Sequence, residues 1–214
     1  MNRFLIHFVL IACFVTTRGA LLPTSIDVRL KSPWFCHDLD CPAFAIEDDK
    51  VARDMELRNY AAAQWVSTNV SDVKYDEAVR TGFWRLFQYI SGTNEEDLKI
   101  EMTAPVKVQV VPGAGPYCKS QFKISFFVPI ESQGSAPKPT DSAVYLDDAP
   151  AARFFVYSYP GFTYESKMLD KLNTALAALN TTDYKYDASY FFTAGYDSPF
   201  RLINRHNEVW IPAL

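Results

Sequence analysis

An internal repeat with a period of 89 residues is the feature that most constrains the fold of this chain. Segments 75–91 and 164–179 carry apolar residues at matching positions, with the 3.6-residue spacing of a buried helix face. A strand-like run at 65–70 precedes the first of these segments, and it matches 154–159 before the second. The matched apolar positions are Val79, Phe83, Leu86, Phe87 and Ile90 in one helix and Met168, Leu172, Ala175, Leu176 and Leu179 in the other.

Shorter echoes follow both helices and complete the repeat. Residues 102–105 are echoed by 192–195, and 127–129 by 210–212, so each half reads as strand, helix, strand, strand. Other runs rich in β-forming residues are Met55–Tyr60, Val106–Val111 and 122–130. Neither half can cover its own helix and sheet edges, so we expect two halves to join. The sequence predicts an α+β domain in which one antiparallel, barrel-like sheet carries both helices outside.

Composition and charge limit the class of protein. The chain is 49% hydrophobic and 21% charged, which suits a packed domain and excludes a disordered one. The formal net charge is -4, without the excess of Lys and Arg that tracking a phosphate backbone requires. We therefore expect neither a nucleic acid nor an anionic membrane as partner.

Residues 1–19 are typical of a cleaved secretory signal. Arg3 precedes an apolar run from Phe4 to Val15, which is shorter than the about 20 residues of a membrane-spanning helix. Thr17 and Gly19 suit cleavage before Ala20. The mature chain would lose two arginines and carry a net charge of -6, and we expect it to be secreted, extracellular and monomeric.

Secretion would allow the cysteines to form a disulfide and two asparagines to carry glycans. Cys36 and Cys41 are close enough in sequence to form a disulfide, which would leave Cys118 unpaired. Asn69 and Asn180 begin Asn-x-Ser/Thr sequences and become candidate glycosylation sites. We expect a short N-terminal extension at 20–43 that contains the cysteine pair, followed by the main domain at 44–214.

Several motifs along the main domain together resemble the SOUL haem-binding protein family. The resemblance covers nearly the whole mature chain, from about Cys41 to the C-terminus. The motifs are Met55–Tyr60 (MELRNY), 64–68 (QWVST), 81–83 (TGF), 89–94 (YISGTN), 100–106 (IEMTAPV), 193–199 (TAGYDSP) and 204–210 (NRHNEVW). The resemblance implies a distorted eight-stranded antiparallel β-barrel with two helices, built as a pseudo-duplication, in agreement with the repeat.

For function, the resemblance implies non-catalytic binding of haem or another tetrapyrrole. In relatives, the residue before the tyrosine of the opening motif can be a histidine proposed as an axial iron ligand, and here it is Asn59. An amide is a poor ligand for haem iron, so we expect haem to be held without strong axial ligation.

Other members are thought to hold the porphyrin in a shallow apolar pocket between the first helix and a late loop. The matching residues are Arg80, Phe83, Leu86, Phe87 and Arg201. A porphyrin needs an apolar surface and cations for its two carboxylates, so the phenylalanines would contact the ring and the arginines its propionates. The alternative is that both phenylalanines face the core and that Arg80 is solvated.

Weaker candidates for iron ligation are histidines and tyrosines. His37 lies beside a cysteine, and His206 lies in a polar segment that we interpret as a surface turn between strands. Tyrosine can also bind haem iron, but the chain has 12 of them and none stands out. The tyrosines considered are Tyr60, Tyr190 and Tyr196.

Catalytic and metal-binding motifs are weak. Three acidic clusters, 47–49, 95–97 and 147–148, lack the spacing of a calcium loop, and we interpret them as solvated loop charge. Cys118 lies among glycines and prolines, without a sign of thiol activation. An enzyme is the least supported class. We expect a secreted tetrapyrrole carrier or scavenger, with a secreted protein-interaction or other small-ligand module that has lost haem binding as the alternative.

Overall fold

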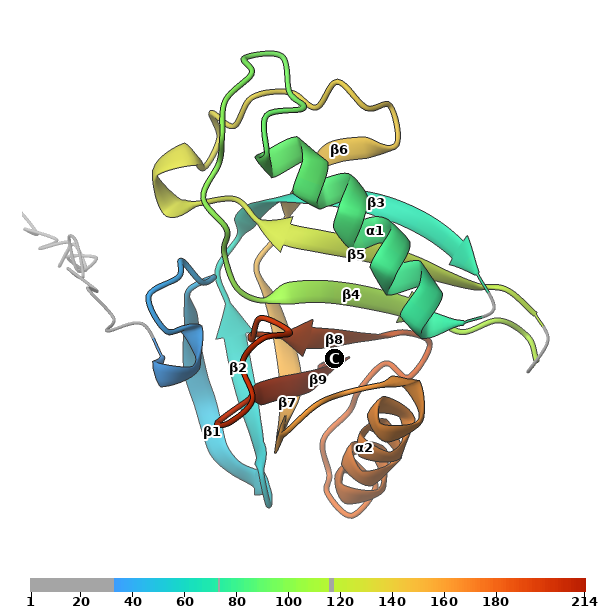
Figure 1. Cartoon of the computed structure of the whole chain (residues 1–214). Coiled ribbons are helices and arrows are strands. Elements are labelled where there is room, and N and C mark those ends of the chain that lie inside the picture. The colour runs from blue at the N-terminus through green and yellow to red at the C-terminus, as the bar shows by residue number, and fades with distance from the viewer. Residues whose placement is uncertain (1–32, 73, 116–117) are drawn as a thin grey trace, which may run out of the picture. The chain divides into compact units, whose positions relative to one another are not determined.

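The structure is a computed structural model that describes residues 33–72, 74–115 and 118–214. In these residues nine strands form one antiparallel sheet, and two α-helices pack on it (Figure 1). The strands are β1 (Phe44–Ala52), β2 (Met55–Tyr60), β3 (Ala63–Asp72), β4 (Val106–Val111), β5 (Ser120–Phe127), β6 (Val144–Ala149), β7 (Ala152–Pro160), β8 (Phe191–Gly195) and β9 (His206–Pro212). The helices are α1 (Tyr75–Ile90) and α2 (Glu165–Leu179), with short 3-10 turns η1 (Trp34–Cys36) and η2 (Ile130–Ser132).

The order of the strands confirms the two-fold repeat. The sheet runs β1-β2-β7-β9-β8-β4-β5-β3-β6, so the first half contributes β3-β5-β4, the second contributes β7-β9-β8, and they meet at β4 and β8. The strand that precedes each half crosses to the other half, because β2 pairs with β7 and β6 pairs with β3. Each half thereby covers an edge of its neighbour, as we expected from halves too small to close alone.

The predicted α+β class and barrel-like sheet are confirmed, but the strand count and two local interpretations need correction. The described residues contain nine strands and not eight, since β1 adds a strand beside β2. Acidic residues 47–49 lie on β1 and 147–148 on β6, and these are the two outermost strands. An edge strand faces solvent along one side and tolerates charge, so loops were the wrong interpretation. Only 95–97 lies in a loop.

The similar segments 102–105 and 192–195 do not occupy equivalent positions in the two halves. Residues 102–105 precede β4, whereas 192–195 lie within β8. The two strands themselves are neighbours in the sheet.

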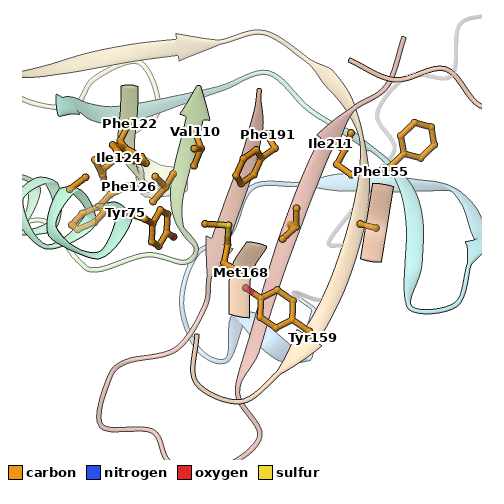
Figure 2. Close-up of a cluster of buried hydrophobic side chains, with 14 of the residues drawn as sticks. Tyr75, Val110, Phe122, Ile124, Phe126, Phe155, Tyr159, Met168, Phe191 and Ile211 are labelled. Carbon is orange, nitrogen blue, oxygen red and sulfur yellow. The ribbon is translucent and has the colours of Figure 1, made fainter. Parts of the chain in front are cut away.

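The main hydrophobic core lies between the helices and the sheet. Figure 2 shows Tyr75 from α1 and Met168 from α2 pointing at strand residues such as Phe122 and Phe191. α1 lies so close to β5 that a Cβ added at Gly82 would be 2.6 Å from the side chain of Ile124. α1 carries Asp76 and Glu77 in its first turn, where negative charge stabilises the helix dipole.

A second cluster of buried rings lies around η1, β2, β8 and β9. The predicted disulfide lies within this cluster. Cys36 and Cys41 are joined, with their Cα atoms 6.2 Å apart. The ring of Phe35 stacks on His206, with ring centroids 4.1 Å apart. Cys118 is free and exposed.

The expected signal peptide at 1–19, its cleavage before Ala20 and the start of the extension at 20–43 lie outside the described residues. Those boundaries stay predictions. In the segments that the structure describes, neither helix has the length and apolar character to cross a membrane.

Candidate functional site

The outward face of α1 carries aromatic side chains that the core does not enclose. α1 rests on β3 and β5 through residues such as Leu86, which is fully buried, and the opposite side of the helix faces solvent (Figure 1). Phe83 is half-buried and Phe87 is 39% exposed. The two phenylalanines therefore do not simply face the core.

The exposed rings of α1 pack against one another. The rings of Phe83 and Phe87 are nearly parallel, with an interplanar angle of 13° and centroids 5.9 Å apart. Phe83 also packs edge-on against Phe126 of β5, which connects the surface rings to the core. Together these contacts fix the positions of the rings on the surface of α1.

Trp84 extends this surface and was missed by the sequence analysis. Its side chain is 57% exposed and lies edge-on to both Phe83 and Phe87, with centroids 5.9 and 5.6 Å away. Positions 83, 84 and 87 share one helix face because residues three and four apart are neighbours. A large aromatic residue at i+4 from Arg80 is the signal that could have identified it. We call Arg80, Phe83, Trp84 and Phe87 the outer α1 face.

The two arginines predicted to hold propionates are both accessible, and each has an acidic neighbour. Arg80 pairs with Glu77 on the preceding turn of α1. Arg201 lies in the β8–β9 connection, 3.2 Å from the carboxylate of Asp197. Arg80 shares a helix face with the aromatic rings by its spacing of three and four residues. No hydrogen bond or ion pair joins Arg201 to α1 among the residues described.

Asn59 lies in a different part of the sheet from the outer α1 face. It is exposed on β2, where it pairs with Ala45 of β1 and Arg153 of β7. α1 packs on β3, β5 and β6. The family's two models for haem binding, an axial ligand at position 59 and a pocket beside the first helix, thus refer to separate surfaces of this chain.

His206 is a buried structural residue, and its interpretation as part of a surface turn was wrong. It opens β9, is 8% exposed, and its Nε2 lies 2.7 Å from a carboxylate oxygen of Glu208. β9 lies between β7 and β8, so its first residues are covered although their sequence is polar. His37 is partly exposed, and its Nε2 lies 3.0 Å from Asp197. Both imidazoles are already engaged by carboxylates.

Glu208 is the centre of a buried polar network. Arg58 donates to its carboxylate at 2.9 Å, Tyr196 at 2.8 Å and Trp210 at 2.7 Å. Burial alone would raise the pKa of Glu208, but the hydrogen bond from His206 and the charge of Arg58 outweigh it and lower the pKa to about 2. The carboxylate therefore stays ionised and anchors β9 to β2.

The tyrosines considered for iron ligation do not converge on the outer α1 face. Tyr60 and Tyr196 are buried in the polar network, and burial raises the pKa of each phenol. Tyr190 packs edge-on against Phe192. A tyrosinate ligand would require an ionised phenol, which burial disfavours at both network tyrosines.

The remaining candidate positions are accessible. Asn69 and Asn180 are both exposed, and their side-chain oxygens accept hydrogen bonds from Tyr145 and Tyr186. Within the described ranges, no three His, Cys, Asp or Glu side chains are grouped so that they could hold a metal ion.

Comparison with known proteins identifies related chains. A family model described as "SOUL heme-binding protein" matches residues 39–212. Heme-binding protein 2 of Homo sapiens is 42% identical over 156 residues, which are 73% of this chain and 76% of that protein. The Mus musculus protein of the same name is 40% identical over 175 residues, or 81% and 85% of the two chains. Heme-binding protein 1 of Xenopus laevis is 29% identical over 77% of this chain and 85% of its own.

Solved structures add support for the fold alone. The crystal structure of the EcmrR C-terminal domain superposes with a TM-score of 0.56 at 10% identity, covering 75% of this chain and 96% of that one. Such a likeness extends the architecture to a distant sequence and leaves the ligand open.

Proposed function

The chain belongs to the SOUL haem-binding protein family, and on that premise we propose that it binds haem or a related tetrapyrrole, without catalysis, on the outer α1 face. The observation that supports this site is the aromatic surface made by Phe83, Trp84 and Phe87, which ends at Arg80. A tetrapyrrole is a flat apolar disc with carboxylates at its rim. An exposed row of rings ending in a guanidinium fits that chemistry.

Each residue of the outer α1 face has a distinct role in this proposal. Phe87 and Trp84, the more exposed rings, contact the macrocycle, while Phe83 supports them from below. Arg80 leaves Glu77 to pair with a propionate, and Arg201 takes the second propionate if the ligand reaches the β8–β9 connection. Leu86 is fully buried, so it supports the helix and does not contact the ligand.

Affinity without a bond to iron is expected to be moderate. Burying about 400 Å² of apolar surface at about 25 cal/mol per Å² yields about 10 kcal/mol. Association costs of at least about 4 kcal/mol leave about 6 kcal/mol, which corresponds to a dissociation constant of tens of micromolar. Stacking and propionate pairing would tighten this into the micromolar range. When bound, haem would supply its own iron chemistry, and this chain would supply a surface and a charge.

We further propose that the protein acts outside the cell as a monomeric carrier or scavenger. Disulfides persist in oxidising compartments such as the extracellular space, and the Cys36–Cys41 disulfide supports such a location. The leader-like sequence at 1–19 and the two exposed glycosylation sequences point the same way. Mass spectrometry of the secreted protein tests this proposal. We expect a chain that begins at Ala20 and carries glycans at Asn69 and Asn180, and retention of residues 1–19 in the secreted product would overturn it.

Titration of the purified mature protein with haemin tests the binding site. Because a fully buried aromatic side chain contributes about 1.5–3 kcal/mol, Phe87→Ala should weaken haemin binding about tenfold. Arg80→Ala should weaken it less, since its partner propionate remains solvated. Tyr164→Ala is the matched control, because Tyr164 is an exposed ring (55%) outside α1 and outside the β8–β9 connection. Equal affinities of all three variants and the parent would refute the outer α1 face as the site.

Asn59 favours the second candidate function, a secreted interaction module that has lost haem binding. Under that function the exposed rings of α1 would contact a protein or another apolar ligand. Haemin affinity no better than that of an unrelated acidic protein, together with ligand-free recovery from the natural source, would support it over the first.

A further inference from the structure

A cavity of about 240 Å³ lies on the face of the sheet turned away from the helices. Strand residues alternate between faces, so Val108 and Val110 of β4 enter the helix-covered core while Lys107 and Gln109 reach the other side. Six aromatic side chains contribute to the walls of this cavity. They are Tyr60, Trp65, Phe154, Tyr190, Phe192 and Trp210.

Lys107 brings a positive charge into these aromatic walls. Its Nζ lies 3.5 Å from the centre of the Trp65 ring and 5.6 Å from that of Phe192. The Trp65 contact is a cation–π interaction, which stabilises an ammonium without an oxygen acceptor. Nowhere in the described part of the chain does an oxygen accept a hydrogen bond from this Nζ or form an ion pair with it.

The other charged groups that line the cavity already have partners. Lys123 of β5 lies 2.9 Å from the carboxylate of Asp147 on β6, which also accepts from Ser67. Asp148 accepts a hydrogen bond from Gln64 at 2.8 Å. Lys107 is therefore the cation of the lining that lacks a counter-ion within the described residues, whereas Asp148 has the neutral amide of Gln64 as its partner.

Burial also disfavours the charged form of Lys107. It lowers the pKa of this ammonium to about 7, with a further lowering by Lys123 that Asp147 opposes. A negatively charged ligand inside the cavity would offset the cost of keeping Lys107 protonated. A cationic ligand would leave that cost in place.

We propose that this cavity binds a small aromatic carboxylate, with its carboxylate on the Lys107 ammonium and its ring against the half-buried rings of Phe154 and Tyr190. The volume is below the about 300–1,000 Å³ of pockets for drug-sized ligands, so it suits one or two fused rings. This site is independent of the outer α1 face, since the two lie on opposite sides of the sheet.

Binding of 2-naphthoate to the purified mature protein at pH 6.5, followed by calorimetry, tests the proposal. The matched neutral probe is 2-naphthalenemethanol, which has the same rings without the charge. We expect the acid to bind at least tenfold more tightly than the alcohol, because a charge-assisted hydrogen bond is worth about 1.5–3 kcal/mol. Equal affinities, or no binding of the acid at millimolar concentration, would overturn the proposal.

Variants assign the effect to its residue. Lys107→Met keeps the length and apolar stem of the side chain and should reduce 2-naphthoate affinity at least tenfold, with little change for the alcohol. Lys123→Met, which removes a lysine already paired with Asp147, should change the affinity for the acid less. Phe87→Ala on the outer α1 face should leave it unchanged. A Lys107→Met protein that binds the acid like the parent would refute the site.

Proton uptake gives a readout that needs no variant. If the carboxylate pairs with Lys107, binding at pH 8 should take up close to one proton per ligand, seen as a dependence of the binding enthalpy on the buffer. Binding of the acid without proton uptake would contradict the assignment to Lys107.

Discussion

Arg58 on β2 donates a 2.9 Å hydrogen bond to Glu208 on β9, 150 residues further along the chain. Both side chains are buried, at 4% and 0% exposure. β2 and β9 are not neighbours in the sheet, because β7 lies between them. The ion pair therefore connects the strand that precedes the first half of the repeat to the last strand of the second half.

Removing the negative charge of this pair should strongly destabilise the protein. Glu208→Gln leaves Arg58 as a buried cation without its main counter-ion, and breaking a buried pair in this way costs about 3–5 kcal/mol. Chemical denaturation measures the loss in free energy of unfolding. Glu56→Gln is the control, since Glu56 also pairs with Arg58 but is 32% exposed, and it should cost about 1 kcal/mol or less. Similar losses for the two variants would contradict the central role of Glu208.

Stability should fall in acid for the same reason. The folded protein lowers the pKa of Glu208 from 4.5 to about 2, so its stabilising contribution is present above pH 4.5 and is lost as the pH falls toward 2. Thermal unfolding between pH 6 and pH 2 would show the decline. The Glu208→Gln protein should decline less over this range, and an identical slope in both proteins would show that other carboxylates dominate.

Gly82 should tolerate no side chain while α1 stays in place. Gly82→Ala puts a methyl group 2.6 Å from Ile124, and overpacking a core in this way costs about 1–3 kcal/mol even though alanine favours a helix. Gly195→Ala is the control, because a Cβ there meets nothing within 4 Å. Thermal unfolding should show a clear loss only for Gly82→Ala, and a stabilised Gly82→Ala protein would mean that the helix can shift.

Introducing a histidine at position 59 tests where haem binds. Asn59 lies on β2, and α1 packs on β3, β5 and β6. If the ligand lies on the outer α1 face, Asn59→His should therefore leave the broad, ligand-poor absorption spectrum of bound ferric haem unchanged. Absorption spectroscopy of haem-loaded parent and variant measures this. A sharp, histidine-ligated Soret band in the variant would place the haem at β2 instead.

The affinity for an aromatic acid should depend on pH through Lys107. Pairing with a carboxylate raises the pKa of Lys107, so affinity should be greatest below pH 7 and fall by up to about tenfold per pH unit above it. Lys123 and Asp147, the charged groups that face Lys107 from β5 and β6, form an ion pair with each other. Titrations of 2-naphthoate from pH 6 to pH 9 test this, and Lys107→Met should remove the dependence.

Local sequence patterns identified the helices and the repeat because those features depend on neighbouring residues. The apolar stripes at 3.6-residue spacing located α1 and α2 to within a residue or two, and the repeat anticipated two joined halves. The ring pair of Phe83 and Phe87 could also be predicted, since residues four apart on a helix must lie side by side. The close spacing of Cys36 and Cys41 was enough to propose their disulfide.

By itself, the sequence determined which residues form helices, which form the repeated strands, and which side chains share a helix face. Only the tertiary structure decided that β1 and β6 are strands, that polar His206 and Glu208 are buried, and that Lys107 enters an aromatic cavity. The physical reason is that periodicity separates the two faces of a strand, whereas burial depends on which distant strands become its neighbours. β2 and β6 exchange between the halves, and that exchange sets those neighbours.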